Sequence, residues 1–142
     1  MVSGFRMSPM TTRARVQLLA GAALRIVAGA MFAFHGAQKI LGVLEPNGQP
    51  AVGSQLWVGG IIELVGGILI AIGLFTRPAA LLASGTMAVA YLQFHWKLAF
   101  DHAKFLPAVN GGELAVLYCF VFLVFAVSGA GAYSLDGRRG RG

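Results

Sequence analysis

Residues 56–75 read LWVGGIIELVGGILIAIGLF, a run of apolar side chains and glycines that contains one charged residue, Glu63. A helix needs about 20 mostly apolar residues to cross a hydrocarbon core that is about 30 Å thick. The stretch therefore predicts a transmembrane helix. A charge near the middle of a membrane costs ~2.5–3.5 kcal/mol on insertion scales, so Glu63 requires an explanation of its own.

Three further stretches have the same length and character, and together with the first they account for most of the 142 residues. The four predicted spans are residues 16–41, 56–75, 78–98 and 111–131. Only 11% of the residues are charged, against about 25% in an ordinary soluble domain. We therefore predict an all-α membrane protein, a four-transmembrane-helix antiparallel bundle over residues 16–136 with short tails at residues 1–15 and 137–142.

The positive charges are unevenly distributed. The net charge is +6, and seven arginines precede the first span, lie in the second loop or follow the last span: Arg6, Arg13, Arg15, Arg77, Arg138, Arg139 and Arg141. Because basic residues in short segments mark the cytoplasmic face, both tails are expected to be cytoplasmic. Such tails attract anionic lipid headgroups, so the lipid bilayer is the expected partner. Nucleic acid is not expected to bind. A signal peptide ending near Ala30 is the alternative for the N-terminus, although Arg25 would interrupt its apolar region.

Ionisable side chains inside the spans form a candidate site. At 1.5 Å per residue, the distances from the centre of each span toward the outer face are ~4 Å for Glu63, ~9 Å for His35, ~10 Å for His95 and ~12 Å for Glu113. Glu63 and His35 are the candidate catalytic residues, as a proton or quinone site. A wider polar cluster for binding a cofactor comprises Arg25, Lys39, His95 and Glu113.

Each of these residues also has a purely structural interpretation. Glu63 can pair with His35 or Lys39. Arg25 can extend toward the inner headgroups, or it can be a buried donor to the carbonyls of a neighbouring helix or to a bound anion. Asn110-Gly111-Gly112-Glu113 has the spacing of a capping box, in which Asn110 caps the helix and Glu113 returns to its amide. His95, which precedes Trp96, can be an interfacial histidine.

The sequence gives no sign of a metal or redox centre. The histidines and carboxylates lack the spacing of a metal site, so no metal is expected. The single cysteine, Cys119, cannot form an intramolecular disulfide and excludes thiol–disulfide exchange by this chain alone. No haem, flavin or iron–sulfur motif is present, so a redox cofactor would have to come from a partner protein.

These motifs, in this order, resemble the DoxX family of small bacterial membrane proteins. The resemblance covers roughly residues 16–136 and lies in Arg25 with the run HGAQK at 35–39, GIIELVGG at 60–67, GLFTR at 73–77, NGGE at 110–113 and GAGAYSLD at 129–136. It implies a four-helix bundle with cytoplasmic termini in the bacterial cytoplasmic membrane. The family is named for its similarity to a membrane subunit of a thiosulfate:quinone oxidoreductase.

The resemblance therefore implies a membrane subunit of, or accessory to, a quinone-linked oxidoreductase in sulfur, thiol or oxidant-stress metabolism. In this reading the buried polar cluster handles a quinone headgroup or its protons, and the activity depends on a redox partner protein or on a homo-oligomer. A non-catalytic membrane scaffold or assembly factor is the alternative, in which the polar groups only fix helix register. A small proton-coupled transporter is the third and weaker hypothesis, because four short spans without a repeat do not favour it.

Overall fold

The computed structural model describes residues 10–45, 48–100 and 103–139, and this part of the chain is all-helical, with no β-strand. Its helices are α1 (Thr12–Leu41), α2 (Gln55–Ile72), α3 (Thr76–Ala90), η1 (Tyr91–Trp96), α4 (Pro107–Asn110), α5 (Glu113–Ser128) and α6 (Leu135–Arg139). The π-helical segment η1 continues α3. The all-α prediction is confirmed, and each of the four predicted spans coincides with α1, α2, α3 with η1, or α5 to within a few residues.

Two of these helices, α1 and α2, are long and apolar enough to cross a membrane. Helix α5 is equally apolar but has 16 residues. Local signals fix the ends of the two long helices. The hydroxyls of Thr11 and Ser54 accept hydrogen bonds from the amides three residues later, and Gly42 and Gly73 end the helices in the left-handed region, which glycine adopts without strain.

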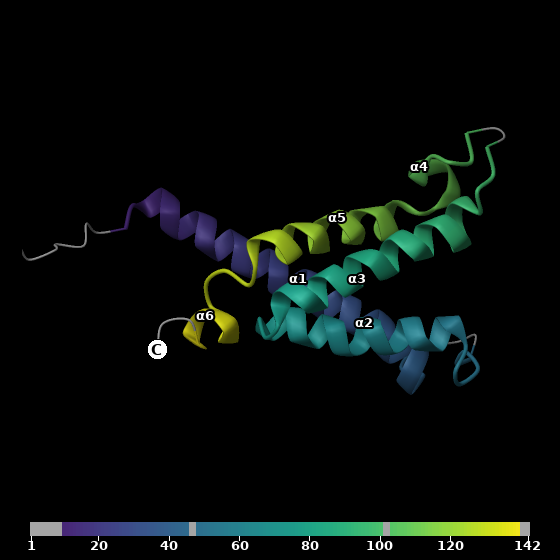
Figure 1. Cartoon of the computed structure of the whole chain (residues 1–142), viewed down its shortest axis with the longest axis horizontal. Helices are drawn as coiled ribbons and strands as arrows, with labels where there is room; N and C mark the ends of the chain where they lie inside the picture. The colour runs from purple at the N-terminus through teal and green to yellow at the C-terminus, as the bar shows by residue number, and fades with distance from the viewer. Residues whose placement is uncertain (1–9, 46–47, 101–102, 140–142) are drawn as a thin grey trace, which may run out of the picture.

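The helices pack as two pairs, α1 with α2 and α3 with α5, and α2 and α3 join the pairs. Figure 1 shows α2 and α3 close together at their short turn and separating toward their other ends. The large buried side chains lie between the pairs and include Phe32, Ile70, Met87 and Phe122.

Close contact between α1 and α2 depends on small residues. A Cβ atom at Gly29 would lie 2.6 Å from the amide nitrogen of Ala71, and one at Gly36 would overlap the backbone of Leu64. The same holds in reverse at Gly67, where a Cβ would overlap the backbone of Ala33. Small residues on the facing sides of α1 and α2 thus allow the two backbones to touch, as in membrane helix pairs.

Candidate functional site

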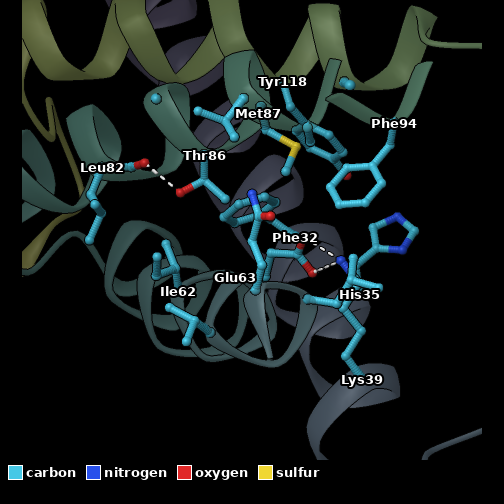
Figure 2. A pocket seen from close by; sticks show the side chains of 18 of the residues that line it. Phe32, His35, Lys39, Ile62, Glu63, Leu82, Thr86, Met87, Phe94 and Tyr118 are labelled. Atoms are coloured by element: carbon cyan, nitrogen blue, oxygen red, sulfur yellow. Dashed lines mark hydrogen bonds and ion pairs between the residues drawn. The ribbon is translucent and has the colours of Figure 1, made fainter. Parts of the chain in front are cut away.

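A pocket of about 880 Å³ lies between α2 and α3, with α1 and α5 contributing to its walls (Figure 2). Most of its lining is apolar. The polar side chains that reach it are His35, Lys39, Gln55, Glu63, Thr86, His95 and Tyr118. The pocket therefore brings together four residues of the predicted cluster, namely Glu63, His35, Lys39 and His95, and leaves out Arg25 and Glu113.

An ion pair holds Glu63, the most buried polar residue of the pocket. The Lys39 ammonium donates to both carboxylate oxygens of Glu63, at 2.5 and 2.7 Å (Figure 2). The Glu63 side chain is 4% exposed, whereas that of Lys39 is 33% exposed. Gly60, one turn before Glu63, makes the pairing possible because a Cβ there would lie 2.9 Å from the Cβ of Lys39. Lysine from the last turn of α1 thus crosses α2 over a glycine to reach the carboxylate.

His35 does not pair with Glu63. Both residues lie in the described part of the chain, and no hydrogen bond joins them. The His35 ring instead meets the Tyr118 ring edge-on, with 6.4 Å between centroids and 85° between planes. Depth along the helices placed the two candidate catalytic residues at similar levels, but it does not define their direction around each helix axis. Lys39 is the partner that the structure selects.

Tyr118 is a pocket residue that sequence reasoning missed. It comes from α5, is 6% exposed and stacks on Phe122, with 5.4 Å between ring centroids. Its hydroxyl is buried and has no hydrogen-bond partner. The available signal was a polar aromatic residue in the middle of the fourth apolar stretch, but a neutral side chain does not stand out in a search for charges.

His95 reaches the pocket from the end of η1. Its Nδ1 atom lies 3.4 Å from the backbone oxygen of Asn110, and its ring stacks on Tyr91 at 6.4 Å between centroids. These contacts tie η1 to the segment that precedes α5. His95 therefore lines the pocket and also anchors a loop.

Glu113 lies outside the pocket and is exposed, and the predicted capping box is wrong. Asn110 ends the short helix α4, and its side-chain oxygen accepts from the amide of Gly112 at 2.8 Å. Gly111 adopts the left-handed conformation, so α5 begins with Gly112 at its N-cap and without a side-chain cap. An extra turn at Asn110-Gly111 breaks the three-residue spacing that a capping box needs.

Arg25 is fully buried at the opposite end of α2. Its Nη1 donates to the carbonyls of Ile70 and Ala71 at 2.9 and 2.7 Å, and its Nη2 donates to that of Tyr133 at 2.8 Å. The last carbonyls of a helix have no amide donors within the helix, and the Arg25 guanidinium donates hydrogen bonds to them. Of the two sequence interpretations, extension toward headgroups is wrong and donation to a neighbouring helix is confirmed.

The same end of the fold contains a second residue that sequence reasoning passed over, Asp136. Its carboxylate accepts from the amides of Phe75 at 3.0 Å and Thr76 at 2.9 Å, and its own amide donates to the Gly73 carbonyl. Partial burial acts to raise the pKa of Asp136, but the two amide hydrogen bonds and nearby Arg139 outweigh burial, so the pKa lies below its usual value. The C-terminal segment thereby caps the first turn of α3.

No cluster of three or more histidine, cysteine and carboxylate side chains suited to a metal occurs in the described ranges 10–45, 48–100 and 103–139. The interactions available to a ligand in the pocket are therefore hydrogen bonds, contact with one ion pair and packing against apolar walls.

The DoxX family profile matches residues 20–96, which is more than half of the chain. The chain belongs to the DoxX family. It is also 48% identical over 118 residues to an uncharacterized protein of Haemophilus influenzae, and the match covers 81% of this chain and 87% of that protein. No solved structure shows a significant match.

Within this DoxX protein, the family match and the polar residues overlap only in part. Residues 20–96 include Arg25, His35, Lys39, Glu63 and His95, whereas Tyr118 and Asp136 follow the matched region. The pocket and the α2–α3 turn are therefore each completed by residues from the last third of the chain.

Proposed function

We propose that this DoxX protein crosses the bacterial cytoplasmic membrane four times, through α1, α2, α3 with η1, and α5, as an antiparallel bundle with cytoplasmic termini. The outer faces of these helices support the proposal, because they expose large apolar side chains such as Leu24, Val27, Leu117, Phe120 and Val124. A bilayer would shield these apolar side chains from water, whereas in solution they would be exposed to it. The described arginines at the start of α1, at the start of α3 and in α6 are also consistent with one cytoplasmic face.

Within that bundle, we propose that the α2–α3 pocket binds the headgroup of a membrane quinone, as part of a quinone-linked oxidoreductase. The pocket itself is the observation that carries this proposal. Its volume of about 880 Å³ falls in the range of small-molecule sites, about 300–1,000 Å³. It combines apolar walls with a few convergent polar groups, which suits a lipophilic molecule with a polar ring.

Access from the lipid is the second support. Leu81, Leu82, Val58 and Val89 line the pocket and are also between 43% and 62% exposed on α2 and α3. A molecule dissolved in the membrane could thus enter between these helices without crossing water. His35, Glu63 and Tyr118 lie deeper and would face the ring.

The chemistry would be shared with a partner. A redox centre in a partner protein supplies two electrons to the quinone, and two protons from pocket side chains or water complete the quinol. Glu63 and His35 are the residues that could exchange those protons. The Lys39 ammonium compensates the Glu63 charge, which would otherwise be expensive inside a membrane.

A scaffold function is the second candidate, and one observation favours it. The Lys39 ammonium hydrogen-bonds both oxygens of Glu63, and three backbone carbonyls engage the Arg25 guanidinium. Polar groups that are paired in this way can fix helix register without taking part in chemistry. The two candidates differ in whether the pocket holds a quinone.

Purification from the native membrane in mild detergent tests the proposal. Bound quinone should copurify with the wild-type protein, and Glu63→Gln should lose it while remaining abundant. Glu113→Gln is the matched control, since it makes the same change at an exposed carboxylate outside the pocket. Full quinone retention and full partner-dependent quinone reduction in Glu63→Gln would favour the scaffold.

Topology is tested separately. Reporter fusions after Thr12 and after Arg139 should both read cytoplasmic, and a fusion after Gly48 should read external. A periplasmic reading at either terminus would overturn the four-span arrangement.

A further inference from the structure

We propose that Tyr118 is the residue that hydrogen-bonds the ring oxygen of the bound quinone. This inference rests on the proposed quinone function and identifies the hydrogen bond that would recognise the quinone headgroup. It starts from the hydroxyl of Tyr118, which is buried and unpartnered in a residue that lines the pocket. Buried polar groups in folded proteins are almost always hydrogen-bonded, so an orphan hydroxyl in a pocket wall indicates a partner that arrives with the ligand.

Two of the other polar groups that line the pocket, Glu63 and His95, are already engaged, whereas His35 makes only a ring contact with Tyr118. Both oxygens of Glu63 accept from Lys39, and His95 lies against the backbone of Asn110. A ligand oxygen that displaced the ammonium from Glu63 would have to break a nearly buried ion pair. A contact with Tyr118 breaks no existing hydrogen bond.

The position of the ring suits this role. Figure 2 shows Tyr118 in the region of Met87, Phe94 and Phe32. The Tyr118 ring also stacks on that of Phe122, with 5.4 Å between the ring centroids. Edge contact with His35 and stacking on Phe122 restrict the phenol to a narrow range of directions. A preorganised group loses little entropy when it binds.

The chemistry of a phenol also fits both redox states. A tyrosine hydroxyl donates to the carbonyl oxygen of a quinone and accepts from the hydroxyl of a quinol. A phenylalanine ring does neither, although it fills nearly the same space. Tyr118→Phe therefore removes the proposed contact and preserves the packing against Phe32 and Phe122.

Equilibrium binding of two probes to the detergent-purified full chain tests the inference. The probes are a decyl-substituted benzoquinone and decylbenzene, which lacks the ring oxygens. Wild-type protein should prefer the quinone, and Tyr118→Phe should weaken quinone binding about tenfold while leaving decylbenzene unchanged. Tyr133→Phe is the matched control, because its side chain is 71% exposed and it is not among the residues that line the pocket.

Thermal stability without ligand provides the independent measurement. Tyr118→Phe should not lower the melting temperature, since its hydroxyl has no partner to lose. Tyr91→Phe should lower it, because the Tyr91 hydroxyl donates to the Phe105 carbonyl and accepts from Asn110. A drop in Tyr118→Phe as large as that in Tyr91→Phe would overturn the inference by showing a partner within the protein.

The binding outcomes separate the inference from the function on which it rests. Wild-type binding of the quinone together with unchanged binding in Tyr118→Phe would overturn the role of Tyr118 and leave the quinone site standing. Equal affinity of the wild type for the quinone and for decylbenzene would show that the pocket binds only the apolar part of the ligand, and this result would also overturn the inference. Absence of quinone binding by the wild type would overturn both proposals.

Discussion

Removing Lys39 should destabilise the protein far more than removing Glu63, although the two form one ion pair. In Lys39→Met the Glu63 carboxylate stays behind with a side chain that is 4% exposed, and an uncompensated buried charge costs about 3–5 kcal/mol. In Glu63→Met the orphaned lysine is 33% exposed near the end of α1, so its ammonium can turn outward to water or headgroups. We expect that loss to be about 1 kcal/mol, close to that of a surface pair.

The double variant Lys39→Met with Glu63→Met completes the comparison. Replacing a whole buried pair by apolar side chains of similar size is often neutral, so its unfolding free energy should lie within about 1 kcal/mol of the wild type. Reversible unfolding in detergent micelles by titration with a denaturing detergent measures all four proteins. Two results would refute this reasoning. They are an equal loss of unfolding free energy in the two single variants, and a loss in the double variant that equals the sum of the two.

The same cycle on His35 and Glu63 gives a different expectation. The sequence allowed either His35 or Lys39 as the partner of Glu63, but the structure places no hydrogen bond between His35 and Glu63, and the His35 ring meets that of Tyr118. The effects of His35→Gln and Glu63→Gln on stability should therefore add to within about 0.5 kcal/mol. A strong coupling between the two substitutions would instead support a direct interaction between His35 and Glu63.

Three further predictions concern other parts of the fold. Gly36→Ala should destabilise by about 1–3 kcal/mol in the same unfolding assay, because a Cβ there overlaps the backbone of Leu64, whereas Gly21→Ala has open space and should stabilise slightly. Asp136→Asn should remove a pH-dependent part of the stability. Because the folded-state pKa of Asp136 is lowered, that part is present above the usual aspartate value of 3.8 and is lost as the pH falls through the folded-state pKa, so wild type and variant should converge in acid. Glu113→Ala should change the unfolding free energy by less than about 0.5 kcal/mol, since the side chain is exposed and caps no helix; a larger loss would support the capping box.

Sequence predicted the helices well because their signal is local. The length of an apolar stretch is a property of consecutive residues, and α2 begins at Gln55, one residue before the predicted span. The choice of Glu63 as the central polar residue also followed from one local fact, a charge in an apolar helix. Its partner did not follow, because depth leaves the direction around the helix undefined.

The residues that complete the two polar regions could not be found in the same way. Tyr118 carries no charge, so a search for costly ionisable groups passes over it. Asp136 acts on amides 60 and 61 residues earlier in the chain, and no local pattern encodes such a distance. The capping box failed for the opposite reason, since a local pattern was overridden by a glycine in the left-handed conformation at position 111.

Attachment of the C-terminal segment to the α2–α3 turn has a consequence for biogenesis. Tyr133 and Asp136 leave the ribosome after all four long helices, yet they supply an acceptor for Arg25 and the cap for the first turn of α3. Until they arrive, the nascent chain holds a buried guanidinium and two helix-start amides without these partners. Docking of this segment at the α2–α3 turn can therefore occur only after the four long helices have been synthesised.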